Sequence, residues 1–118
     1  MLTKVINTLE AATKLPVEPF ETDEIKDCIL YKYYPVSDDG AVAQHTIEIR
    51  LITNTIERAE IYKKQIIKAL VSVGDDEKIE GILSCELNGG GSLKEYGTNT
   101  IHSLMYFNLT TRSDNYER

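Results

Sequence analysis

The stretch that decides the fold is HTIEIRLITNTIERAEIYKKQIIKAL, residues 45–70. Positions 46, 48 and 50 are polar and positions 47, 49 and 51 are Ile, Ile and Leu. This alternation predicts a strand with one packed and one solvated face. The residues that follow repeat apolar side chains at helical spacing and predict a helix from about 55 to 72. Because Asn54 and Glu57 have the spacing of a capping box, we expect the helix to begin at Asn54 or Thr55.

The predicted helix 55–72 is amphipathic, with two exceptions. Ile61 falls on its polar side, and Lys63 falls on its apolar side. The apolar side consists of Ile56, Ala59, Tyr62, Ile66, Ile67, Ala69 and Leu70. We therefore expect one side to face the core and Ile61 to be left on the surface.

Two hairpins are predicted around this helix. Residues 28–34 are rich in aromatic and β-branched side chains, residues 35–40 have turn chemistry, and residues 44–53 form the second strand of a hairpin. After the helix, a strand is expected at about 80–87 and a last strand at 100–110. Large side chains on both faces of the last strand predict a central position. The connection 88–99 contains four glycines, so we expect a long, mobile loop.

The chain begins with a predicted helix over its first 14 residues, which Pro16 and Pro19 stop. The acidic segment 18–27 is expected to be a solvated connection, and the tail 112–118 to be frayed. The order α-β-β-α-β-β predicts an α+β fold, a mostly antiparallel sheet with two helices packed on one face. We expect residues 1–111 to form a single domain.

Composition excludes several classes of function. The chain has 118 residues and a net charge of −6, the wrong sign for a protein that binds nucleic acid by neutralising phosphates. No stretch approaches the roughly 18 apolar residues of a membrane helix, so no membrane association is expected, and no signal-peptide core is predicted near the start. Cys28 and Cys85 lie in apolar runs, which indicates buried thiols in the reducing cytosol.

No catalytic, cofactor or metal signature is present. A Cys–His pair would have to combine Cys28 or Cys85 with His45 or His102 across strands, and no zinc-ligand spacing occurs. The segment Gly89–Lys94 lacks the spacing of a phosphate-binding loop. The pairs at 38–39 and 75–76 are more simply turn residues than calcium ligands. We expect a non-enzymatic protein without cofactor or metal.

The predicted sheet has a face that its helices leave uncovered. Tyrosines at positions 31, 33 and 34 are spread over both faces of one strand, and Ile61 adds apolar surface. Exposed apolar surface of this kind marks an interaction site. Self-association is the simplest way to bury it.

The passage from the strand to the charged helix in residues 45–70 resembles the middle of the small tail-terminator, or tail-to-head joining, proteins of long-tailed bacteriophages. The resemblance covers most of the chain: a short first helix, an acidic, proline-bearing link, a hairpin, the strand-to-helix passage and a closing hairpin with a long loop. It implies a tail completion protein, a structural component without catalytic residues. Copies form a ring, typically a hexamer, that ends the tail tube and gives the head its docking surface.

The partners implied by this resemblance are the chain itself, the tail tube protein and the head–tail connector. DNA would pass the lumen of the ring without sequence-specific binding, and the acids at 18–27 and 75–80 would repel it. Replacing such acids by lysine should then slow DNA ejection. The implied location is the virion tail, with the host cytoplasm during assembly. A head-closure or neck component is a related reading.

Interface positions are expected in loops 36–42 and 88–99 and around residue 61. The residues predicted to make oligomer or partner contacts are Tyr31, Tyr33, Asp38, Asp39, Ile61, Tyr62, Gly90, Lys94 and Tyr96. The alternative from another class is a small cellular α+β module that acts as a dimer and binds a peptide or protein by adding a strand to its sheet edge. An enzyme with a site between subunits is the third reading.

Overall fold

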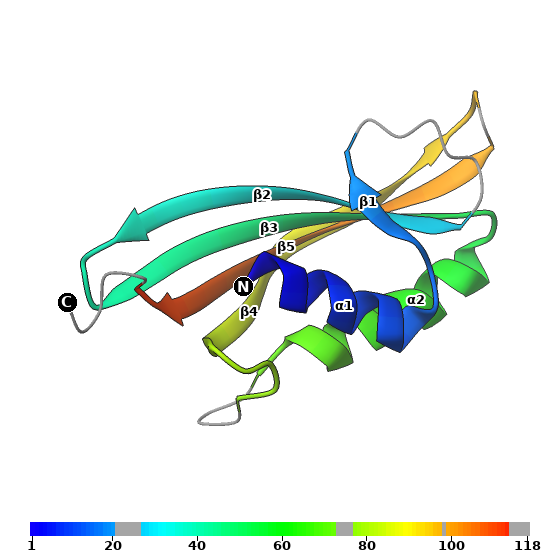
Figure 1. Cartoon of the computed structure of the whole chain (residues 1–118). Coiled ribbons are helices and arrows are strands. Elements are labelled where there is room, and N and C mark those ends of the chain that lie inside the picture. Colours follow the sequence, from blue (N-terminus) through cyan, green and yellow to red (C-terminus); the bar gives the residue numbers. More distant parts are fainter. Residues whose placement is uncertain (21–26, 73–76, 98, 114–118) are drawn as a thin grey trace.

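Figure 1 shows a long, curved sheet with two helices on one of its faces; this computed structural model describes residues 1–20, 27–72, 77–97 and 99–113. Within that part of the chain the sheet has the order β1-β2-β3-β5-β4, and only β1 and β2 are parallel. The elements are α1 (Leu2–Thr13), β1 (Val17–Pro19), β2 (Cys28–Asp38), β3 (Val42–Thr53), α2 (Ile56–Leu70), β4 (Ile82–Glu95) and β5 (Thr100–Arg112). The predicted α+β fold is confirmed, with β5 between β3 and β4 as expected.

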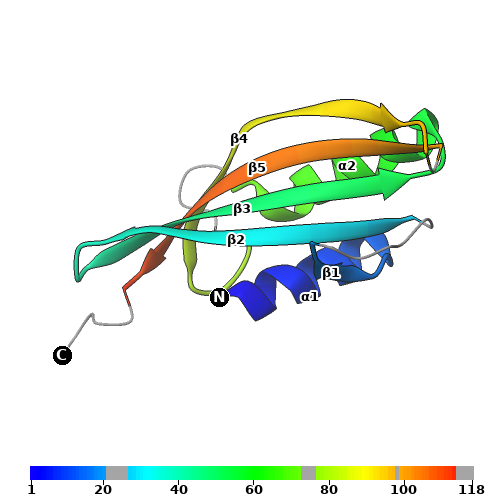
Figure 2. The same ribbon diagram turned by 90° about the horizontal axis from the view of Figure 1, so that it is seen from above.

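The main core lies between the helices and one face of the sheet (Figure 2). In β3, Ile47, Ile49 and Leu51 are fully buried against the helices, as the alternation predicted. In α1, Val5 and Leu9 join them, and Thr13 is buried among the apolar residues although it is polar. The Thr13 hydroxyl donates a 2.8 Å hydrogen bond to the carbonyl of Leu9, so its burial leaves no donor unsatisfied.

A smaller core lies on the opposite face of the sheet, near β1. Cys28, Leu30 and Ile52 are buried there with Phe20 packed against them. The guanidinium of Arg50 lies 5.3 Å from the centre of the Phe20 ring, a cation–π distance. One end of the open face therefore has its own apolar cover, and the rest of that face has none among the described residues.

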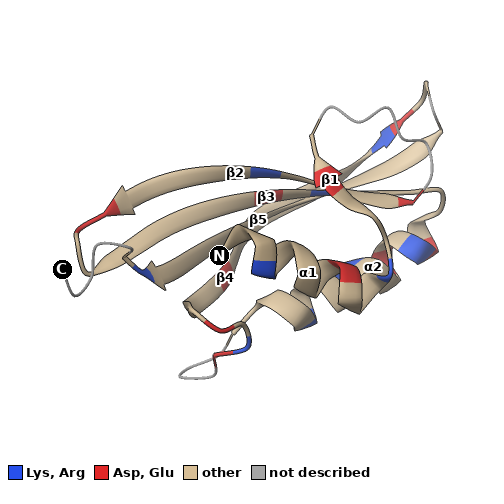
Figure 3. Cartoon of the chain, viewed as in Figure 1, with Lys and Arg blue, Asp and Glu red and all other residues tan. Residues whose placement is uncertain are grey.

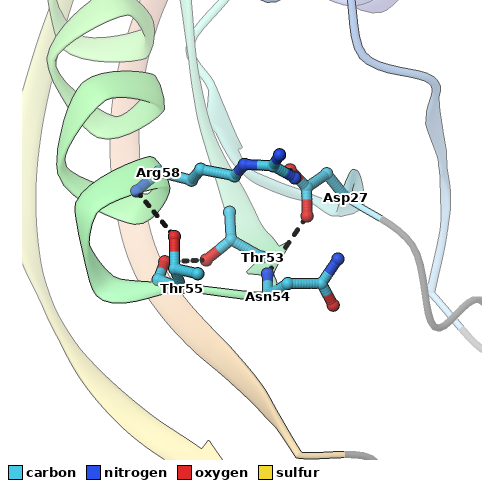
Figure 4. Close-up of polar contacts among 5 residues, drawn as sticks. All are labelled: Asp27, Thr53, Asn54, Thr55 and Arg58. Atoms are coloured by element: carbon cyan, nitrogen blue, oxygen red, sulfur yellow. Dashed lines mark hydrogen bonds and ion pairs between the residues drawn. The ribbon is translucent and has the colours of Figure 1, made fainter.

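Three sequence-based expectations about the ends of elements need correction. The connection 18–27 begins with β1, which pairs with β2; residues 21–26 lie outside the described part of the chain. The predicted turn at 35–40 is mostly strand, because β2 continues through a bulge to Asp38. The capping box of Asn54 does not form. Thr55 is the N-cap, and its side chain accepts a 3.2 Å hydrogen bond from the amide of Arg58 (Figure 4).

The predicted loop 88–99 is the largest correction. The strand starts at Ile82 rather than at about 80 and continues through the glycines to Glu95, paired with β5 throughout. A bulge between Leu87 and Gly90 shifts the register there, and Gly89 takes a φ of 100°. The glycines that predicted a loop are compatible with a strand here, because they permit a bulge and a close approach of β4 to β5.

The predicted frayed tail, residues 112–118, is only partly within the described part of the chain. Arg112 ends β5 and Ser113 is buried, donating its amide to the carbonyl of Ala41 at 2.9 Å. The start of the predicted frayed tail is therefore ordered, and residues 114–118 lie outside the described part. The acids at 75–76 also lie outside it.

Candidate interaction surface

A groove opens where the start of α2 faces the β4–β5 hairpin. Its volume is about 350 Å³. Ile56 forms part of one wall and is 60% exposed, and Leu93 on β4 is 47% exposed. The sequence placed Ile56 on the core side of the helix, and this expectation is wrong. The first turn of α2 lies beyond the main core, which α2 enters with Tyr62, Ile66, Ile67 and Leu70.

Charged side chains line the same groove. Lys63 and Glu60 come from α2 and Lys94 comes from β4. The ammonium of Lys94 lies 5.6 Å from the centre of the Tyr96 ring, and Tyr96 itself is 84% exposed. We refer to the site lined by Ile56, Glu60, Lys63, Leu93, Lys94 and Ile101 as the α2–β4 groove.

The start of α2 holds the wall of this groove in place (Figure 4). Asp27 accepts hydrogen bonds from the amide of Asn54 and from the guanidinium of Arg58, both at 3.1 Å. The hydroxyl of Thr53 donates to the carbonyl of Thr55 at 3.0 Å. These contacts tie the end of β3, the first turn of α2 and the start of β2 together, so Ile56 projects from a fixed backbone.

The tip of the β2–β3 hairpin carries an exposed apolar side chain beside an acidic turn. Val36 is 62% exposed. Asp38 accepts the amide of Gly40 at 2.9 Å, and Asp39 accepts the amides of Ala41 and Val42 at 2.9 and 2.8 Å. Hydrogen bonds from Ser113 and Gly40 lower the pKa of Asp38, and the amides of Val42 and Ala41 lower that of Asp39. The tip, residues 36–39, is therefore doubly negative at neutral pH.

The predicted interface residues fall into separate places. Tyr31 and Tyr33 lie half-buried on the helix side of β2 and contact the main core. The hydroxyl of Tyr33 lies 2.6 Å from Nδ1 of His45. Ile61 is 57% exposed on α2, whereas Tyr62, next to it, packs on the core. The structure brings Lys94 and Tyr96 together, and places Asp38 and Asp39 at the other hairpin.

Gly90 has a structural reason to be glycine. A Cβ built on it would collide with the carbonyl oxygen of Leu104 and lie 3.2 Å from the carbonyl carbon. Ile56 and Leu93 are not among the individual residues that the sequence predicts at an interface. Two features of the sequence could have indicated their exposure. Ile56 directly follows the cap residue of the helix, and Leu93 is an isolated apolar residue in a glycine-rich stretch.

The cysteines and histidines do not form a nucleophilic pair. Cys85 and His45 are both in register with Leu109, which lies between them, and Cys28 and His102 flank Ile52 in the same way. Two strand spacings separate each pair by roughly 10 Å, well beyond a hydrogen bond. Burial raises the pKa of the Cys85 thiol to about 11. Among the described residues, no three His, Cys, Asp or Glu side chains lie together as metal ligands.

His102 lies on the open face, beside Arg50. Burial, and then the charge of Arg50, lower its pKa below 6.5. Its Nε2 lies 3.1 Å from the hydroxyl of Thr100, and its buried Nδ1 has no hydrogen-bond partner among the residues that the structure describes. This histidine is therefore neutral at physiological pH.

In the described part of the chain, no helix is long and apolar enough to span a membrane.

Comparison with solved structures finds a likeness of fold that extends over most of the chain. The chain superposes on a chain from the structure of the virion of a native gene transfer agent (GTA) particle, with a TM-score of 0.69 and 14% sequence identity. The match covers 96% of this chain and 95% of that one. No family model matches the sequence, and no curated protein matches it. The likeness therefore establishes a shared fold over nearly the full length.

Proposed function

We propose that this protein is a structural component of a phage-like virion. The observation that carries the proposal is the likeness of fold to a chain of a virion particle, which covers 96% of this chain and 95% of that one. A fold is shared by proteins of different functions, so the likeness supports the proposal together with the exposed apolar residues on both hairpins and on α2. No enzymatic activity forms part of the proposal.

The specific role proposed is that of a tail terminator. Copies of the chain form a ring, with six subunits expected, that ends the tail tube and offers a docking surface for the head. Apolar residues exposed in the single copy, such as Val36, Ile56 and Ile61, support this role because subunit contacts would bury them. The tail tube protein and the head–tail connector are the proposed partners.

The test is the solution mass of the purified protein by light scattering over a wide concentration range, with negative-stain images of the same fractions. Rings of about six subunits are expected at high concentration. Addition of the protein to growing tail tubes should then stop their elongation, whereas a head-closure protein would leave elongation unchanged. A protein that forms no ring at any concentration would contradict the proposed assembly.

A second candidate function has one observation in its favour. In the described part of the chain β4 is a sheet edge, and every residue from Glu86 to Glu95 is exposed. An exposed edge strand can accept a peptide as an additional strand. This alternative, a peptide-binding dimer, predicts a mass of two subunits at all concentrations. It also predicts that those amides of β4 that point away from β5 become protected only when peptide is present.

A further inference from the structure

The α2–β4 groove and the tip of the β2–β3 hairpin lie at opposite ends of an elongated molecule. The principal extents are 50 × 25 × 22 Å, and Figure 1 shows the β2–β3 turn at one end and the start of α2 with the β4–β5 hairpin at the other. We infer that the hairpin tip of one copy docks in the α2–β4 groove of a second copy. This inference rests on the proposed function, because it names the contact that joins neighbouring subunits.

Apolar surface is present on both sides of the proposed contact. The tip offers Val36, which is 62% exposed, and the groove offers Ile56, which is 60% exposed. Removing apolar side chains of this size from water on contact favours association of the two copies. A groove of about 350 Å³ has room for a valine side chain and the backbone beside it.

The hairpin tip and the groove carry net charges of opposite sign. The tip carries Asp38 and Asp39, and the groove carries Lys63 and Lys94 against a single Glu60. Figure 3 shows red at the free end of the β2–β3 hairpin, and blue with adjoining red at the end of β4. The tip has a charge of −2 and the groove a charge of +1, so bringing them together is electrostatically favourable.

The same charges argue against a two-fold contact. Two tips placed together would bring four carboxylates into proximity, and two grooves would bring Lys63 and Lys94 of each copy together. The favoured contact is therefore heterologous, tip to groove. A heterologous contact repeats from copy to copy and forms a ring when the rotation between neighbouring copies closes. Because the two sites lie at opposite ends of one copy, a single copy cannot satisfy its own groove.

Cysteine cross-linking tests the contact directly. The variants are Val36→Cys, Ile56→Cys and the double variant with both changes, treated with a short bismaleimide at concentrations where the protein assembles. The matched control replaces Ile56→Cys by Ile61→Cys, on the same helix and with 57% exposure against 60%. Wild-type protein controls for Cys28 and Cys85, which are each only 1% exposed.

The double variant should give a ladder of covalent oligomers. An equimolar mixture of the two single variants should stop at covalent dimers, because each copy then has only one reactive end. The Val36→Cys and Ile61→Cys combination should cross-link at least tenfold less. Covalent dimers of Val36→Cys alone, in place of the ladder, would overturn the inference by indicating a two-fold contact.

The outcomes separate this inference from the proposed function. Rings without a ladder would keep the ring and overturn the tip-to-groove contact. A ladder without rings would support the contact and count against a closed terminator ring. Failure of both would overturn both, and rings with the ladder would support both.

Discussion

The close approach of β4 and β5 predicts a large difference between two neighbouring glycines. A Cβ at Gly90 would collide with the carbonyl oxygen of Leu104, whereas a Cβ at Gly91 would have no atom within 4 Å. Gly90 also has a φ of 157°, and Gly91 lies outside the positive-φ region. Alanine at Gly90 therefore has to push two paired strands apart, while alanine at Gly91 fits without displacement.

The cost can be worked from the structure. A backbone oxygen cannot rotate away, so relieving the collision requires a shift on the order of 1 Å, with overpacking of about 1–3 kcal/mol. Such a shift weakens the hydrogen bonds that flank the bulge, each with a net value of about 1 kcal/mol. We expect Gly90→Ala to lower the free energy of unfolding by about 2–3 kcal/mol, or roughly 8–12 °C in Tm for a domain of this size.

Urea unfolding at a concentration where the protein is monomeric measures this difference. Gly91→Ala, the matched control, should stay within about 1 kcal/mol of wild type. Amide exchange at Leu104 and Met105 should accelerate in Gly90→Ala alone, which also detects local separation of the hairpin. Equal free energies of unfolding and equal exchange in the two variants would refute the close approach and the strand assignment of residues 88–95.

Three further predictions concern the start of α2 and the open face. Thr55→Ala should lower the free energy of unfolding by about 1 kcal/mol through loss of the N-cap, and Asn54→Ala, measured by the same thermal melts, should change it by less than half of that. Asp27→Ala should cost about 1–3 kcal/mol in urea unfolding because it removes the acceptor of two hydrogen bonds, and Arg58→Ala, at an exposed side chain, should cost clearly less. The lowered pKa of His102 means that the unfolded chain binds its proton more readily, so stability should fall as pH drops below about 6.5. The Tm of His102→Gln should lack this part of the pH dependence, and an unchanged dependence would assign it to other groups.

The fold was predictable where side chains alternate against the helices. Residues 46–51 predicted β3 and its packed face because every second side chain is fully buried. The helix after them was predictable for the same reason, since its apolar residues repeat at helical spacing over most of its length. The predicted N-cap, Asn54, lies one residue before the observed one. Asn54 and Thr55 are both good N-caps by chemistry. The contact that fixes the amide of Asn54 comes from Asp27, 27 residues away in the sequence, and local spacing does not reveal it.

The strand ends could not be predicted from alternation, and the reason bears on function. Beyond Cys85 every residue of β4 is exposed, and so is every residue of β2 beyond Tyr33. None of these exposed residues belongs to the main core, so selection for a core imposes no period-two pattern there, and glycine and turn residues become acceptable within strands. Yet Val36 and Leu93 remain apolar in these uncovered ends, at a cost in solubility for an isolated copy. Apolar residues that the core does not require are best explained by a surface that is buried in assembly. The regions where sequence patterning fails are therefore the regions where we place the contact between copies.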